Sequence, residues 1–123
     1  MTVGELQNKA LTVVHPRKLS DYAEAGGVGA AILSGDSNVY VGLCIDTACS
    51  MGSCAEHAAA ASMVTVGESR VLQMIAVGWA GNIMPPCGRC REFIRQLNDR
   101  NGEAEVMVRA DVVVALKDLL PWM

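Results

Sequence analysis

The sequence contains no apolar stretch long enough to cross a membrane. A bilayer-spanning helix needs about 18–20 consecutive apolar residues, and polar or charged residues interrupt every apolar run of this chain before that length. The opening residues, MTVGELQNKA, also lack the basic-then-apolar order of an export signal. We therefore expect neither a membrane segment nor secretion.

Basic runs and aromatic residues are also scarce. The net charge is -3, the isoelectric point is about 5.3, and Lys and Arg are dispersed along the chain. This charge argues against a nucleic-acid partner, which would require a basic surface, and favours a small-molecule substrate. Aromatic residues make up only 4% of the chain, so Ala, Val, Leu and Met must fill most of the core.

What the chain does contain is a high proportion of apolar residues. Hydrophobic residues, Tyr included, occupy 51% of the 123 positions, and the chain has 2 Tyr and 12 Gly. Without Tyr and with Gly the share is roughly 59%, whereas globular domains carry about 45–50% in that set. A chain of this length buries about two-thirds of its surface around one core. We therefore expect residues 1–123 to form a single domain, with further apolar surface buried between subunits of a homo-oligomer.

Cysteine occurs five times, an odd number, and two of the five form a Cys-x-x-Cys pair at Cys87 and Cys90. In a chain without an export signal, this pattern favours metal binding or catalysis over disulfides. It also favours a cytoplasmic location, where thiols stay reduced.

Apolar periodicity and turn residues predict alternating helices and strands, with bounds uncertain by about two to four residues. The expected helices cover residues 3–14, 54–66 and 85–97, and the expected strands cover residues 28–33, 39–45, 71–77 and 105–110. Residues 112–116 either add a fifth strand or lead into the final turn. Residues 34–38, SGDSN, predict the turn of a hairpin between the first two strands. Strands separated by helices indicate a layered α/β domain with a mixed sheet.

Three cysteines lie at the predicted starts of two helices: Cys54 on one, and Cys87 and Cys90 on the next. Unpaired backbone N–H groups and the helix dipole favour the thiolate there, which is the form that binds a metal. Cys87 and Cys90 are three residues apart, so both sulfurs can reach one ion. Three protein ligands leave one tetrahedral position of Zn²⁺ open, which is typical of a catalytic site.

Glu56 follows Cys54 by two residues, which places a carboxylate beside the predicted metal. Such a group can carry protons during hydrolysis. Three thiolates give the site a net negative charge, and hydrogen-bond donors near sulfur would offset it. The candidates for that role are His57, Arg89 and Arg91.

Each motif also has a plainer interpretation when taken alone. A Cys-x-x-Cys pair can be a redox pair or half of a structural zinc site, and Glu56 can simply stabilise the helix dipole. In a structural site, Cys49 or His57 would complete the tetrahedron. A purely structural site has no need of a carboxylate beside the metal, so the combination of motifs favours catalytic zinc.

At these residues the chain resembles the cytidine deaminase family of zinc enzymes. The resemblance rests on Cys54-Ala55-Glu56 and Pro86-Cys87-Gly88-Arg89-Cys90-Arg91, with support from Val28-Gly29-Ala30-Ala31 and Leu119-Leu120-Pro121. It implies a three-layer α/β/α domain with a five-stranded mixed sheet, and a homotetramer with one zinc per subunit. It also implies hydrolytic loss of ammonia at C4 of a cytosine nucleoside, with Glu56 as the proton shuttle.

The chain departs from that family where the substrate would bind. Gly26 stands where the family usually has an aromatic residue, Cys44-Ile45-Asp46 replaces Asn-x-Glu, and His57 replaces an Arg. The sequence around Cys87 also resembles that of blasticidin-S deaminases, which accept a bulkier cytosine nucleoside. We therefore expect a more open pocket than in an ordinary cytidine deaminase.

Candidate substrate contacts are Cys44, Asp46 and Ala55. The two tryptophans, Trp79 and Trp122, are either packing anchors or pocket walls. Because aromatic residues are so few, Trp122 is a candidate for lining the pocket of its own or a neighbouring subunit.

Overall fold

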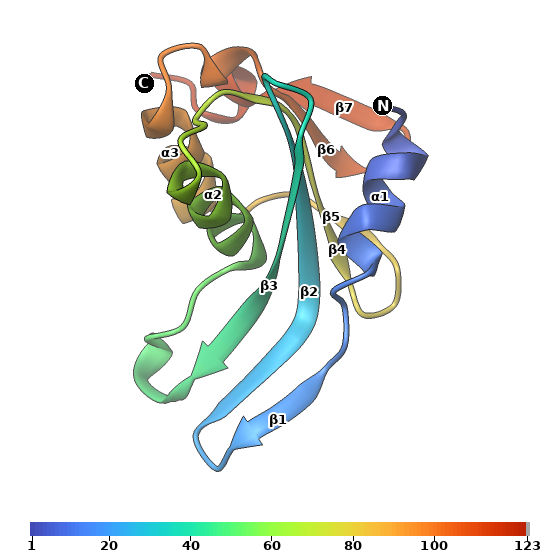
Figure 1. The fold of residues 1–123 in the computed structure, drawn as a ribbon, viewed down its shortest axis with the longest axis vertical. Helices are drawn as coiled ribbons and strands as arrows, with labels where there is room; N and C mark the ends of the chain where they lie inside the picture. Colours follow the sequence, from blue (N-terminus) through green and yellow to red (C-terminus); the bar gives the residue numbers. More distant parts are fainter. Residues whose placement is uncertain (123) are drawn as a thin grey trace.

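The structure is a computed structural model that describes residues 1–122, and it arranges them in three layers (Figure 1). A mixed β-sheet forms the middle layer. Helix α1 (Val3–Leu11) covers one face, while α2 (Ala55–Thr65) and α3 (Gly88–Leu97) cover the other. The predicted α/β/α architecture is confirmed. None of the helices among residues 1–122 has the length and apolar character needed to cross a membrane.

The sheet contains the five expected strands and two more. The expected ones are β2 (Ala23–Ser34), β3 (Val39–Thr47), β4 (Val71–Gly78), β6 (Glu105–Arg109) and β7 (Val112–Ala115). They lie in the order β3-β2-β4-β6-β7, with β4 and β6 parallel and the other neighbours antiparallel.

The two additional strands, β1 (Arg17–Ser20) and β5 (Ile83–Met84), pair with β2 and β4 and raise the count from five to seven. Strand β1 is exposed at every position and β5 has only two residues. Neither strand therefore carries the apolar alternation by which strands are recognised in a sequence.

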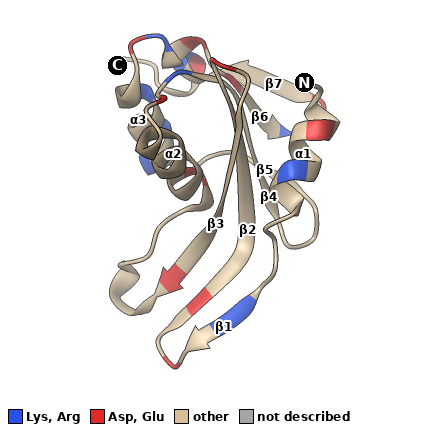
Figure 2. Ribbon diagram, in the orientation of Figure 1, with Lys and Arg blue, Asp and Glu red and all other residues tan. Residues whose placement is uncertain are grey.

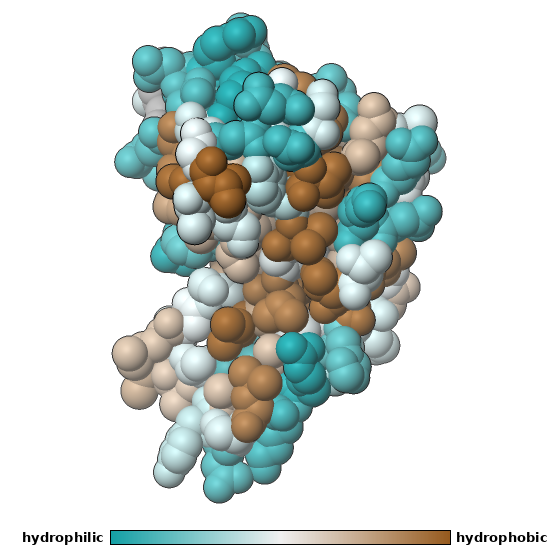
Figure 3. Space-filling model, viewed as in Figure 1, coloured by the Kyte–Doolittle hydropathy of each residue, from teal (hydrophilic) through white to brown (hydrophobic). Residues whose placement is uncertain are grey.

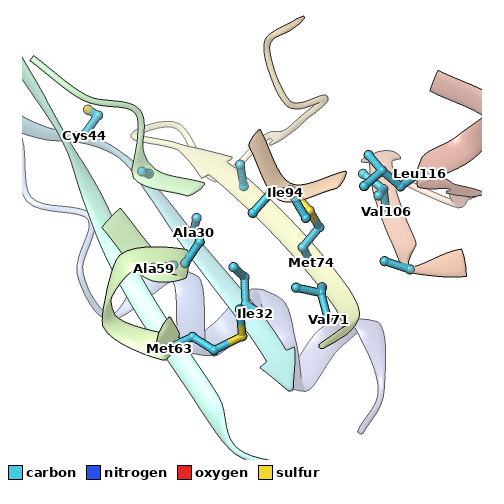
Figure 4. Packing of buried hydrophobic residues seen from close by; sticks show 14 residues of the cluster. Ala30, Ile32, Cys44, Ala59, Met63, Val71, Met74, Ile94, Val106 and Leu116 are labelled. Atoms are coloured by element: carbon cyan, nitrogen blue, oxygen red, sulfur yellow. The ribbon is translucent and has the colours of Figure 1, made fainter. Parts of the chain in front are cut away.

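Side chains of the central strands alternate between two hydrophobic clusters, one on each face of the sheet. On the face of α2 and α3, Ala30 and Ile32 pack with Met63, Met74 and Ile94, together with other buried residues (Figure 4). The opposite cluster, under α1, contains Leu6, Ala10, Ala31, Leu33, Ile75, Val77 and Met107. Strands buried on both faces explain why β2 and β4 read as continuous apolar runs.

Helix α2 lies very close to strand β3 because small residues meet at the contact. A Cβ atom on Gly42 would lie 2.4 Å from the backbone nitrogen of Ala59 and 2.8 Å from the carbonyl oxygen of Ala55. Ala55, Ala59 and Ala60 are fully buried on the same helix. Gly42 therefore determines how closely the first turn of α2 approaches the sheet.

The C-terminal end of helix α3 is held to strand β4 by the buried side chain of Asn101. Its amide oxygen accepts a hydrogen bond from the Val71 nitrogen at 2.8 Å, and its amide nitrogen donates to the carbonyls of Ile94 and Ser69 at 2.9 and 3.0 Å. All polar groups of this fully buried side chain are thus paired.

Residues 1–122 also form three short 3-10 segments, at Ala48–Ser50, Asn101–Glu103 and Leu116–Leu119, the first of which has a left-handed backbone at Cys49. The first of them lies between β3 and α2 and leads into the cysteine site.

Candidate metal centre

Three cysteine sulfurs converge at the N-terminal ends of α2 and α3. Cys54 and Cys87 are the N-cap residues of these helices, and Cys90 lies in the first turn of α3. The three Sγ atoms all lie within 4.8 Å of one another, and the Cys54 and Cys87 sulfurs are 3.5 Å apart. All five cysteines are free. The structure thus brings together the three residues predicted as ligands.

This donor set fits a zinc ion. Zn–S bonds of about 2.3 Å in a tetrahedron place two sulfurs about 3.8 Å apart, close to the observed spacing of the Cys54 and Cys87 sulfurs. Neither cap residue uses its side chain to pair with the first-turn N–H groups, so these groups are available to stabilise thiolates.

The charge balance of the cysteine cluster also favours a cation. Burial, followed by the hydrogen bond with Cys87, raises the pKa of Cys54. Burial and the nearby charge of Glu56 raise the pKa of Cys90 strongly. For Cys87 burial acts in the same direction, but hydrogen bonds from Cys90 and Cys54 outweigh it and lower the pKa. Three close thiols of this kind are stabilised as thiolates by a bound metal.

Glu56 is the buried carboxyl group beside the cluster. It lies in the first turn of α2, only 5% exposed, and it lines the same pocket as Cys54 and Cys87. Burial raises its pKa, while a hydrogen bond from its own backbone N–H acts in the opposite direction. A carboxyl group in such surroundings is suited to accept and return a proton.

The pocket above the cluster has a volume of about 800 Å³. Its lining includes the end of β3 with Asp46, the loop from Ser50 to Ser53 and the start of α2, together with Trp79 after β4 and Pro85 after β5. The segments come from distant parts of the chain. The pocket therefore offers a cavity large enough for a small organic molecule, with Glu56 and the cysteines at one wall.

The loop before Cys54 is held by Ser53 and by Gly52, whose role was not predicted from the sequence. Ile45 and Ser53 form an isolated antiparallel β-bridge. The Ile45 nitrogen donates to the Ser53 carbonyl at 2.9 Å, and the Ser53 nitrogen donates to the Ile45 carbonyl at 3.0 Å. A Cβ atom on Gly52 would lie 1.8 Å from the Ile45 carbonyl oxygen. Only glycine fits there, and a Gly two residues before a ligand cysteine was the available signal.

Of the four candidate substrate contacts, three line the pocket and one does not. Cys44, Asp46 and Ala55 are lining residues. Trp122 is fully exposed near the C-terminus and is outside the pocket of its own chain. Trp79, in contrast, lines the pocket.

The side chain of Cys44 already has a structural partner. Its sulfur accepts a hydrogen bond from the Val28 backbone nitrogen at 3.2 Å and lies 3.9 Å from an Asp46 carboxylate oxygen. Cys44 is only 7% exposed. Asp46 is exposed and is paired with Glu24 between strands β3 and β2. Figure 2 shows charges of both signs close together where β1, β2 and β3 extend beyond the helices.

Gly26 lies in an irregularity of β2, where the pairing register with β3 shifts between Ala25 and Gly29. Its φ angle is +86°, and a Cβ atom would lie 2.1 Å from the His15 carbonyl oxygen. This backbone conformation excludes an aromatic side chain at position 26.

The three predicted hydrogen-bond donors near the cysteines make other contacts. Arg91 Nε donates to the Pro86 carbonyl at 2.8 Å and so supports the segment before Cys87. Arg89 is exposed and lines the pocket. The imidazole of His57 stacks on Phe93. Among residues 1–122, neither His57 nor Cys49 belongs to the group of converging ligands, as a closed structural site would require.

Comparison with known proteins agrees with this site. Residues 6–103 match the family described as the cytidine and deoxycytidylate deaminase zinc-binding region. The curated cytidine deaminase of Mycobacterium tuberculosis strain H37Rv is 32% identical over 96 residues, which cover 76% of this chain and 69% of that protein.

Solved structures of similar proteins have the same fold. The crystal structure of cytidine deaminase from Mycobacterium tuberculosis matches with a TM-score of 0.82 and 26% identity, covering 99% of this chain and 96% of the other. That of cytidine deaminase from Burkholderia pseudomallei matches with a TM-score of 0.79 and 26% identity, covering 99% and 98%.

Proposed function

This chain belongs to the cytidine and deoxycytidylate deaminase family, and from that premise we propose that it converts a cytosine nucleoside to the uracil nucleoside and ammonia. It is a hydrolase that acts on the C–N bond of a cyclic amidine, with one zinc per subunit. The observation that carries the proposal is the convergence of three cysteine sulfurs beside the buried Glu56 at the wall of an open pocket.

Cys54, Cys87 and Cys90 are the residues that hold the zinc. The chemistry that zinc supplies when bound is activation of water for attack at neutral pH. The chain itself contributes the two helix N-termini that stabilise the thiolates, and the Arg91 contact that supports the segment before Cys87. The pocket opens onto this site, as a hydrolase requires.

Glu56 moves the protons of the reaction. Its carboxylate transfers the two protons of the attacking water, one to ring nitrogen N3 and one to the departing amino group, while a C–O bond forms and the C4–N bond breaks. No oxidant or reductant is needed, because water and the amino compound give the oxo compound and ammonia. Burial raises the pKa of Glu56, which supports protonation during the cycle.

Asp46 binds a hydroxyl group of the substrate sugar. Its carboxylate is exposed and lines the pocket at the end of β3, and a carboxylate accepts strong hydrogen bonds from hydroxyls. Ala55 contributes apolar wall beside the reacting base. The sulfur of Cys44 is occupied by Val28 N–H, so its contribution is to support Asp46.

A bulkier, modified cytosine nucleoside of the blasticidin-S type is the second candidate substrate. It is favoured by one specific observation: on the β2 side the pocket is lined by Gly27 and Val28, which leave that side free of bulky side chains. A pocket of about 800 Å³ has room for a substituent larger than ribose.

We also propose that the protein is a homotetramer in the cytoplasm. Several large apolar side chains are exposed, among them Leu11, Val64 and Val66, and brown side chains gather along the middle of the face in Figure 3. Burial of such surface between subunits would be favourable. The five free cysteines agree with a reducing compartment.

A substrate panel tests the proposed reaction. Zinc-loaded protein is incubated with cytidine, deoxycytidine, cytosine, blasticidin S and an aminopurine nucleoside, and ammonia release is measured. We expect turnover of cytosine nucleosides and none of the aminopurine. Turnover of the aminopurine alone, or of none of the panel, would contradict the proposal. The order of cytidine and blasticidin S distinguishes the two candidate substrates.

A further inference from the structure

Trp79 has no role in the hydrophobic core. It directly follows strand β4, whose neighbouring residues Val77 and Gly78 are buried. Trp79 itself is 75% exposed and belongs to neither of the hydrophobic clusters. A large indole that is exposed beside a cavity lacks the stabilisation that burial would give. A planar ligand that covers it would supply that stabilisation.

Trp79 lines the pocket and is the only aromatic residue among the pocket's described lining residues. The lining also includes Ala76 of strand β4, Met84 of the return strand β5, and Pro85, which follows β5. Pro85 and Pro86 lead directly to the ligand Cys87. Trp79 is therefore connected to the metal centre through a short, well-defined segment.

The turn that carries Trp79 is fixed by hydrogen bonds. The Gly78 nitrogen donates to the Asn82 carbonyl and the Gly81 nitrogen donates to the Gly78 carbonyl, each at 2.9 Å. The Gln7 side chain of helix α1 donates to the Gly81 carbonyl at 3.3 Å. A rigid support lowers the entropy lost when a ligand binds to the side chain that it presents.

We propose that Trp79 is a specificity-determining residue whose indole stacks on the planar ring of the substrate. The inference rests on the proposed function and adds the residue that holds the base. The cytosine ring is flat and uncharged, so stacking is a main source of its binding energy. The β2 side of the pocket is lined by Gly27 and Val28, which offer no aromatic face.

Kinetics of Trp79 variants test the role. We expect Trp79→Ala to raise KM for cytidine at least about fivefold, which corresponds to the loss of one base–aromatic stack, with kcat changed less than twofold. Trp79→Phe should recover most of the loss because it restores an aromatic face. The matched control is Tyr22→Ala, since Tyr22 is equally exposed but lies outside the pocket.

Fluorescence gives a readout that does not depend on turnover, because the chain has only two tryptophans. Trp122→Phe leaves Trp79 as the sole reporter, and Trp79→Phe leaves Trp122. Titration with uridine, the product of cytidine deamination, should change Trp79 emission in a saturable way and leave Trp122 emission unchanged. A response from Trp122 alone would overturn the proposal.

Kinetics of the variant distinguish the role of Trp79 from the proposed reaction. Normal cytidine turnover with an unchanged KM in Trp79→Ala would overturn the role of Trp79 and leave the proposed reaction intact. Absence of turnover with every cytosine nucleoside would overturn the proposed reaction and the stacking role with it.

Discussion

The rings of His57 and Phe93 stack with their centroids 4.3 Å apart and their planes inclined by 22°. His57 follows Cys54 by three residues on α2, and Phe93 follows Cys90 by three residues on α3. Residues three apart share a helix face, so the stack lies one turn behind the sulfurs. It joins the two helices that supply the metal ligands.

Replacement of Phe93 by Ala should therefore loosen the metal centre. We expect the free energy of unfolding to fall by about 1–3 kcal/mol, and zinc to transfer to a chelator several times faster than from the unmodified protein. Phe93→Leu retains apolar volume without a ring and should be milder. Equal zinc-release rates in all three proteins would contradict the role of the stack.

Glu56→Gln should retain the fold and the zinc but lose turnover by a factor of about 10²–10⁴. The amide has nearly the shape of the carboxyl group but cannot carry the proton. Metal analysis and circular dichroism of the variant provide the control. Near-normal turnover on the true substrate, with zinc bound, would show that another group moves the proton.

Gly42→Ala should destabilise the protein because α2 leaves no room for a Cβ atom. Overpacking of this kind costs about 1–3 kcal/mol of the free energy of unfolding. Gly27→Ala is the matched control, since a Cβ atom there meets nothing within 4 Å. Urea unfolding curves of both variants decide the point, and equal midpoints would refute it.

Stability at acid pH should depend on Glu68. Hydrogen bonds from Ser34, Tyr40 and Asn38 lower the pKa of this carboxyl group from 4.5 to about 2. Because the pKa is lower in the folded state, the ionised carboxylate stabilises the folded protein at pH values above the pKa of the unfolded state. This stabilisation is lost as the pH falls from about 4.5 towards 2. In Glu68→Gln that part of the pH dependence should disappear.

The measurement is chemical unfolding at several pH values between about 2 and 6 for the unmodified protein and Glu68→Gln. Tyr40→Phe, which removes one donor to the same carboxylate, should give an intermediate curve. Parallel curves for all three would show that Glu68 makes no such contribution.

The chain should assemble into a homotetramer in solution. Light scattering at micromolar concentration should therefore give four times the chain mass of 13.0 kDa. A clean monomer that retains full activity would contradict this expectation and would also show that the pocket of one chain is sufficient for catalysis.

The sequence alone determined the metal centre and the layer architecture, because both depend on local patterns. Cys54, Cys87 and Cys90 stand at helix starts that can be recognised from neighbouring residues, and apolar runs mark the five main strands. Strands β1 and β5 could not be predicted from apolar runs, because β1 is wholly exposed and β5 is only two residues long.

Only the tertiary structure decided how the pocket is walled, because its walls come from segments far apart in the chain. Trp79 and Trp122 are indistinguishable by type, yet one lines the pocket and the other lies in solvent. Likewise Gly26 and Gly52 are required by carbonyl groups of His15 and Ile45 that fold against them. Such contacts arise from chain packing, which no local pattern encodes.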